Sequence, residues 1–298
     1  MPRRKDIWRC GIAPRSIGQI LSDGGIGPDV HWLPEEPDFT FLADPFGWRD
    51  AAGLLHVFVE QYDYRTRHGI IEALLFDAEL RLVERRPCLA EDWHLSYPQV
   101  FAGDGAVWML PEAHRSGALT LYRDHGCLRD WRPECRIMLD CVPVDASILH
   151  HEGRWWLFYS PATGKFAKQA HLHVAWAETL SGRWTPHPGN PVRVDRASAR
   201  PGGTAVAIGG RIMLPVQDCS ATYGGGVRPL WIETLDEWRF EAVAGDPLEP
   251  PGSAGGYGAG MHTLAACGDV TLFDAKRIDT SLRGLALDVR RRLGGFGR

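Results

Sequence analysis

The stretch ADPFGWRDAAGLLHVFVE, residues 43–60, reads as two short apolar runs joined by a turn. The first run begins at Asp44, the turn residues are DAAG, and the second run ends at Glu60. Short β-rich runs joined by a glycine-bearing turn are typical of a β-hairpin. Asp44 itself has two interpretations: an Asp-Pro turn residue, or an acid placed near the start of a strand for its chemistry.

The same pattern returns four more times along the chain. The later segments are 96–112, 144–160, 199–218 and 261–276, with the turns GDG, HEG, IGG and CGD. The polar residues that open the five segments are 53, 48, 55 and 62 residues apart. A period near 50 residues with strand-rich units is typical of a β-propeller.

Further apolar runs follow four of the hairpins and predict the third strand of a blade, at 69–77, 117–124, 170–178 and 229–235. We therefore predict an all-β, five-bladed propeller that forms one domain. The expected blades are roughly 40–92, 93–140, 141–196, 197–245 and 255–277, the last closed by the N-terminal segment, with a short helix in the tail 278–298. A β-sandwich with coincidental hairpins is the alternative.

Bulk properties narrow the function classes. The formal net charge of −4 argues against binding of nucleic acid or anionic membranes through overall charge. No apolar run reaches the length of a membrane-spanning helix, and Arg9 and Arg15 interrupt any secretory signal. Seven irregularly spaced cysteines suit free thiols in a reducing compartment. A cytoplasmic protein is expected, and the excess of arginine over lysine suits a bacterial source.

In a propeller the innermost strand of each blade lines a central channel. The residues that open the five repeats would then lie near the axis; they are Asp44, Tyr97 with His94 just before it, Asp145, Arg200 and His262. The second strands end at Glu60, Glu112, Ser160, Gln217 with Asp218, and Asp274. If the first strands run away from the mouth of the channel, the second strands return to it, and both sets converge there.

Several motifs, in order, resemble the N-terminal-like domain of glucosamine inositolphosphorylceramide transferase. They are FLADPFG, HLSYPQVF, MLPE, RWWLFYS, HPGNPV, ARPGG and QDCSATYGG, and the resemblance covers roughly residues 8–276. It implies a fold similar to the five-bladed propellers of invertase-like and arabinanase-like glycoside hydrolases. Few residues follow 276, so we expect no separate glycosyltransferase domain and do not carry over a transferase activity.

The resemblance also implies roles for three carboxylates. In the hydrolase relatives, an aspartate of the first blade is the base or nucleophile, which Asp44 matches. A second aspartate, which tunes the acid, opens a later blade, as Asp145 does. A glutamate donates the proton: Glu112 is the preferred candidate and Glu60 the next. Glu112 departs from the relatives' pattern, because their acid generally follows the second aspartate.

Carboxylates crowded into one channel suit glycoside cleavage, which needs one protonated and one ionised group. The expected ligand contacts are His94, Tyr97, Arg200, Gln217, Asp218, Tyr223 and His262. The guanidinium of Arg200 can hold an anionic or hydroxyl-rich ligand, and tyrosine rings can stack on sugars. For each of these residues a purely structural role, such as bonding between blades, is the alternative.

No cofactor is predicted. His171 and His173 lie on one face of a strand, but no third ligand stands near them in the sequence, so no metal site is expected. The prediction is a carbohydrate-active propeller, glycosidase-like, with a glycan or glycolipid substrate. The alternatives are a non-catalytic glycan-binding module and an accessory domain for a glycosyltransferase partner.

Overall fold

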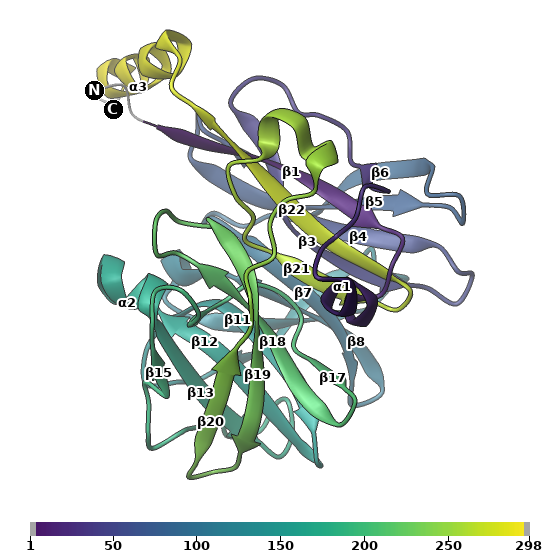
Figure 1. Ribbon diagram of the computed structural model, residues 1–298, viewed down its shortest axis with the longest axis vertical. Coiled ribbons are helices and arrows are strands. Elements are labelled where there is room, and N and C mark those ends of the chain that lie inside the picture. Colours follow the sequence, from purple (N-terminus) through teal and green to yellow (C-terminus); the bar gives the residue numbers. More distant parts are fainter. Residues whose placement is uncertain (1–3, 295–298) are drawn as a thin grey trace.

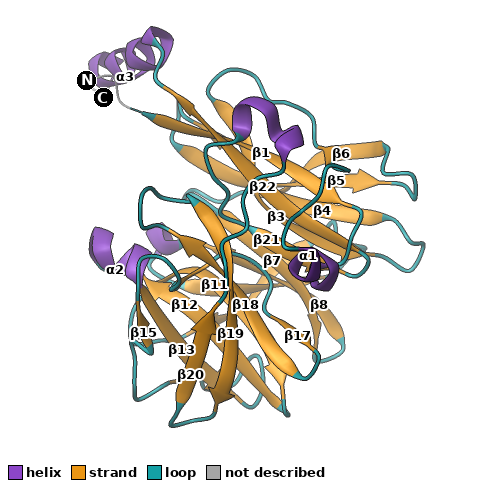
Figure 2. Cartoon of the chain, in the orientation of Figure 1, coloured by secondary structure: helices purple, strands orange, loops and turns teal. Residues whose placement is uncertain are grey.

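The chain folds into five antiparallel sheets arranged as the blades of a β-propeller, which confirms the predicted architecture (Figures 1 and 2). A computed structural model describes residues 4–294, with side chains as far as residue 290. The first blade has the order β3-β4-β5-β6, and the second blade has β7-β8-β9-β10 with β7 innermost. Their strands are β3 (Thr40–Arg49), β4 (Leu55–Asp63), β5 (His68–Phe76), β6 (Leu82–Leu89), β7 (Ser96–Gly103), β8 (Ala106–Glu112), β9 (Leu119–Asp124) and β10 (Trp131–Ile137).

The third and fourth blades each carry a fifth, short strand. In the third blade β15 pairs with β13, and in the fourth the innermost strand is split in two, so that β16 and β17 both pair with β18. Their strands are β11 (Pro143–His151), β12 (Arg154–Pro161), β13 (His171–Ala177), β14 (Thr185–Pro186), β15 (Arg193–Val194), β16 (Arg200–Pro201), β17 (Val206–Ile208), β18 (Arg211–Asp218), β19 (Gly226–Leu235) and β20 (Phe240–Ala244).

The fifth blade joins the two ends of the chain. It consists of β21 (Leu264–Cys267), β22 (Val270–Asp279), β1 (Lys5–Ala13) and β2 (His31–Trp32). β1 pairs with β22 along nine residues, from Lys5 opposite Asp279 to Ala13 opposite Thr271. Figure 1 shows this pairing as purple and yellow strands side by side. The N-terminal strand therefore closes the ring.

Apolar side chains form one core at each boundary between neighbouring blades. Ile12, Leu42 and Leu272 pack together where the fifth blade meets the first. Leu110 and Leu157 belong to the core between the second and third blades. Similar clusters fill the other three boundaries. Because both faces of each blade are covered, the alternating faces of its strands are both apolar, and the ring leaves its polar inner positions for the axis.

Helices are few and short. Among the described residues they are α1 (Ile17–Asp23), α2 (Gly164–Ala170), α3 (Leu282–Gly294) and the 3₁₀ helices η1 (His114–Ser116) and η2 (Gly252–Tyr257). α3 is the terminal helix predicted from the tail, and the buried Lys5 joins it to β1 through bonds to Gly284 O (2.7 Å) and Asp288 Oδ2 (3.1 Å). Within residues 4–294, none of the helices has the length and apolar character needed to cross a membrane.

Candidate functional site

All five blades contribute to a cavity of about 250 Å³, which we call the funnel. Seven of the ten predicted site residues line it: Asp44, His94, Glu112, Asp145, Arg200, Tyr223 and His262. Glu60, the second choice for the acid, also lines it. The expected convergence of blade openings and second-strand ends therefore occurs for these side chains.

A repeated backbone irregularity directs three of the opening residues toward the axis. Asp44, Tyr97 and Asp145 have positive φ angles of 49°, 48° and 47°. Each lies where the pairing of the innermost strand with its neighbour shifts register. A left-handed residue is strained unless it is glycine, and bulges of this kind re-aim a side chain next to functional sites. The same device, used three times, turns polar side chains inward.

Asp44 is the centre of a buried hydrogen-bond network. Its Oδ1 accepts from Thr263 Oγ1 (2.9 Å) and its Oδ2 from the backbone N–H of Tyr97 (3.2 Å). His262 Nε2 lies 3.6 Å from Asp44 Oδ1, and its Nδ1 lies 2.6 Å from Asp274 Oδ2. Burial raises the pKa of Asp44 to about 7, although the charge of His262 acts in the opposite direction. Asp44 therefore changes charge near neutral pH.

Asp44, His262 and Asp274 are also close enough to hold a cation, with ligand atoms within 4.8 Å of one another. Asp274 is already saturated: Oδ1 accepts from the backbone of His262 and Thr263, and Oδ2 from the backbone of Asp44. The three side chains satisfy each other by hydrogen bonding, so the network stands without a metal.

Glu60 and Glu112 end equivalent second strands but have opposite ionisation. Burial, followed by the negative charge of Asp44, raises the pKa of Glu60 well above its ordinary value. Burial acts on Glu112 too, but hydrogen bonds and charge from His114 outweigh it and lower the pKa to about 2. His114 Nδ1 lies 2.5 Å from Glu112 Oε1, and its backbone N–H donates to the same oxygen at 3.1 Å. The funnel thus holds a protonated carboxyl and a carboxylate together.

Asp145 is held by an ion pair between blades. Its Oδ2 accepts from Arg200 Nε (2.6 Å) and from Gln217 Nε2 (2.7 Å). Arg200 also donates to the carbonyl of Lys168 (3.0 Å), and its guanidinium carbon lies 5.0 Å from the ring centre of Tyr223. Arg200 is buried, and its charge is largely neutralised by Asp145. It is therefore a weaker anion holder than the sequence suggested.

Three predicted ligand contacts do not line the funnel. Tyr97 is fully buried, and its hydroxyl lies 2.8 Å from Ser147 Oγ. Gln217 is equally buried and holds Asp145. Asp218 binds Arg228, with 3.0 Å from Oδ2 to Nε. Their direct neighbours are protein groups, as the structural alternative expected.

Aromatic and acidic residues that were not predicted complete the wall: Asp6, Trp8, Phe41, Tyr62, Tyr64 and Ser96. Trp8 stacks on His262, with ring centres 3.7 Å apart. Two sequence signals were available: Tyr62 lies two residues after Glu60 on the same strand face, and Asp6 and Trp8 share a face of β1. The first signal was overlooked; the second needed the register of the closing strand.

Comparison with known proteins adds a family and a fold. A family model described as "Glucosamine inositolphosphorylceramide transferase 1, N-terminal" matches residues 35–249. The curated protein Glucosamine inositolphosphorylceramide transferase 1 of Arabidopsis thaliana is 35% identical over 68% of this chain and 27% of its own length. Its namesake from Oryza sativa subsp. indica is 34% identical over 82% of this chain and 35% of its own length. The chain thus spans about a third of these relatives.

Solved structures share the fold at low sequence identity. A glycosyl hydrolase from Bacteroides ovatus has a TM-score of 0.57 and 12% identity, covering 82% of this chain and 90% of its own. The exo-β-1,3-galactanase 1,3Gal43A from Clostridium thermocellum has a TM-score of 0.54 and 11% identity, covering 69% of this chain and 49% of its own. At such identities the likeness concerns architecture, not chemistry.

Proposed function

Because this chain belongs to the glucosamine inositolphosphorylceramide transferase 1 N-terminal family, we propose that its funnel binds a glycan or glycolipid and hydrolyses a glycosidic bond. One observation carries the proposal: a buried carboxyl with a raised pKa, Glu60, shares a small aromatic-walled cavity with an ionised carboxylate, Glu112. Glycoside cleavage requires a pair of carboxyl groups with pKa values driven apart by their surroundings.

We assign the acid role to Glu60 in place of Glu112. A general acid must carry a proton at working pH, and the raised pKa of Glu60 keeps it protonated. Glu112, with a pKa of about 2, has no proton to give and is tied to His114. His94, whose pKa burial lowers to about 4, lies beside Glu60 as a neutral ring, with 3.5 Å from Nε2 to Oε1.

Asp44 is the proposed base or nucleophile, and the ion pair of Asp145 with Arg200 shapes the field around it. The base must be ionised, and the pKa of Asp44 is about 7, so the rate should fall as pH drops below about 7. Trp8, Tyr62 and Tyr223 offer ring faces and edges for a sugar.

A second candidate function, glycan binding without catalysis, is favoured by the saturation of two carboxylates. Both oxygens of Asp44 already accept hydrogen bonds, and Asp145 is locked to Arg200 and Gln217. If these bonds persist when a ligand enters, the funnel recognises a sugar without attacking it. A role as a module for a glycosyltransferase, suggested by the names of the curated relatives, would use this binding function.

The test compares Glu60→Gln with Glu112→Gln on glycosides that differ in leaving group. The probes are 4-nitrophenyl and 2,4-dinitrophenyl glycosides, including the glucosaminide, with inositolphosphorylceramide-containing vesicles for binding. Loss of a general acid costs roughly 10²–10⁴-fold on poor leaving groups and little on good ones. We expect that pattern for Glu60→Gln and a smaller, leaving-group-independent loss for Glu112→Gln.

Each outcome has a distinct meaning. If Glu112→Gln shows the leaving-group dependence instead, the acid assignment is wrong and hydrolysis stands. If the wild-type protein binds sugars but cleaves none, the binding function replaces hydrolysis. If it neither binds nor cleaves any probe, the funnel proposal fails.

A further inference from the structure

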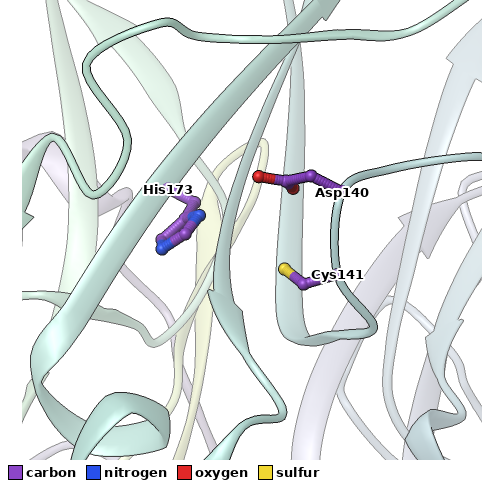
Figure 3. Close-up of side chains that lie close together, drawn as sticks. All are labelled: Asp140, Cys141 and His173. Carbon is purple, nitrogen blue, oxygen red and sulfur yellow. The ribbon is translucent and has the colours of Figure 1, made fainter.

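A second cluster of chemically active side chains lies outside the funnel, where the second blade passes into the third. Asp140 and Cys141 belong to the segment between β10 and β11, and His173 belongs to β13. One donor atom from each residue lies within 4.8 Å of the others. In Figure 3 the carboxylate of Asp140 and the sulfur of Cys141 both point toward His173, which turns one ring nitrogen to them.

The hydrogen bonding of this cluster is incomplete. His173 Nδ1 is buried and, among the described residues, has no hydrogen-bond partner. An unpaired buried polar atom costs free energy, so it calls for a ligand. Asp140 is fixed from behind, because the hydroxyl of Tyr159 donates to its Oδ1 at 3.0 Å. Outer bonds of this kind orient the ligands of metal centres.

We propose that Asp140, Cys141 and His173 form a binding site for a zinc-class divalent ion. Thiolate, imidazole and carboxylate are the three side-chain donors that zinc uses, and sulfur together with nitrogen excludes magnesium and calcium as the preferred ions. Three protein ligands leave the fourth tetrahedral position to water. The ion would clip the segment between two blades to the third strand of the next blade.

A cysteine, a histidine and an aspartate could instead form a nucleophilic triad, but the state of the thiol speaks against it. Burial, followed by the charge of Asp140, raises the pKa of Cys141 to about 12. A nucleophilic cysteine needs a lowered pKa. A bound divalent cation reverses this balance: the S–H proton leaves to solvent as the metal–sulfur bond forms, so binding releases one proton and tightens as pH rises.

An entry path is present. Asp140 and Cys141 line an adjacent cavity of about 310 Å³, together with Leu119 and Met138. Met138 is 74% exposed, so this cavity communicates with solvent. An ion can therefore reach the cluster in the folded chain.

The experiment titrates the purified, chelator-treated chain with Co²⁺ and then Zn²⁺. Co²⁺ bound to a thiolate gives a near-ultraviolet charge-transfer band, and Zn²⁺ should abolish it by displacement at one equivalent. We expect Cys141→Ser and His173→Ala to lose the band, and Tyr159→Phe to weaken Zn²⁺ binding by about 10-fold. Cys127→Ser is the matched control: this thiol is exposed and lies outside the cluster, so its removal should leave the band unchanged.

The proposal fails if no stoichiometric band forms, or if Cys141→Ser retains it. Binding that gives no thiolate band would point to Asp44, His262 and Asp274, which contain no sulfur. Failure here leaves the proposed function untouched, because the funnel carboxylates do not take part in this cluster.

Discussion

Three residues at equivalent places in the first three blades, Asp44, Tyr97 and Asp145, have the same left-handed backbone but different surroundings. Two point acids at the axis, whereas Tyr97 fills the layer beneath and bonds to Ser147. The sequence predicts that all three open a blade. It could not rank Glu60 against Glu112, because their pKa values depend on burial in one case and on His114 in the other.

The raised pKa of Asp44 predicts a pH-dependent stability. Between about pH 4 and about pH 7 the native chain keeps a proton that the unfolded chain has lost, so the free energy of unfolding falls as pH rises, by at most about 1.4 kcal/mol per pH unit for one group. His262, whose pKa is also raised, acts with the same sign. Asp44→Asn should flatten this slope.

The measurement is urea unfolding at intervals from pH 5 to pH 8. Asp63→Asn, at the mouth-side end of β4 but paired on the surface with Arg65, is the control and should keep the wild-type slope. Equal slopes in wild type and Asp44→Asn would show that Asp44 titrates normally.

At the scale of single elements, hairpins were predictable and outer strands were not. Glycine turns between apolar runs mark the inner strands directly. The outermost strands β6 and β20 are largely exposed or half-buried, so their sequences carry little periodicity. The helix α1 did have a signal, since Ser16 and Gln19 form a capping box, but it was overlooked.

The break between β16 and β17 depends on one glycine. Gly203 has φ 146°, and a Cβ there would lie 1.8 Å from the carbonyl oxygen of Leu264 in the next blade. Gly203→Ala should therefore lower the free energy of unfolding by more than about 3 kcal/mol. Gly105→Ala, at φ 74° with open space around it, should cost only about 1–2 kcal/mol. Chemical denaturation of both variants decides it: similar losses would mean that only backbone strain matters, not the contact between blades.

At the scale of the molecule, stability is a property of the closed ring. Five cores lie between blades, and each depends on both neighbours. β1 contributes Ile12, fully buried, to the core between the fifth and first blades. The closing strand is therefore an integral part of the fold and not an appendage.

Ile12→Ala tests this role. Removing a fully buried isoleucine side chain should cost about 2–5 kcal/mol. The matched control is Ile278→Ala on the paired strand β22, where the side chain is 40% exposed and the loss should stay below about 1 kcal/mol. Thermal and urea unfolding would show whether the difference exists. Equal, small losses would mean that β1 frays from the ring without consequence.

The pairing of β1 with β22 also sets an order of events during synthesis. Lys5 meets Asp279, so the first strand to leave the ribosome waits for almost the whole chain before its partner exists. At about 5–20 residues per second that wait lasts tens of seconds. Throughout it, an apolar strand edge stays open to wrong partners. Long-range closure of this kind slows folding, and a chaperone that shelters the nascent N-terminus should raise the yield of native protein.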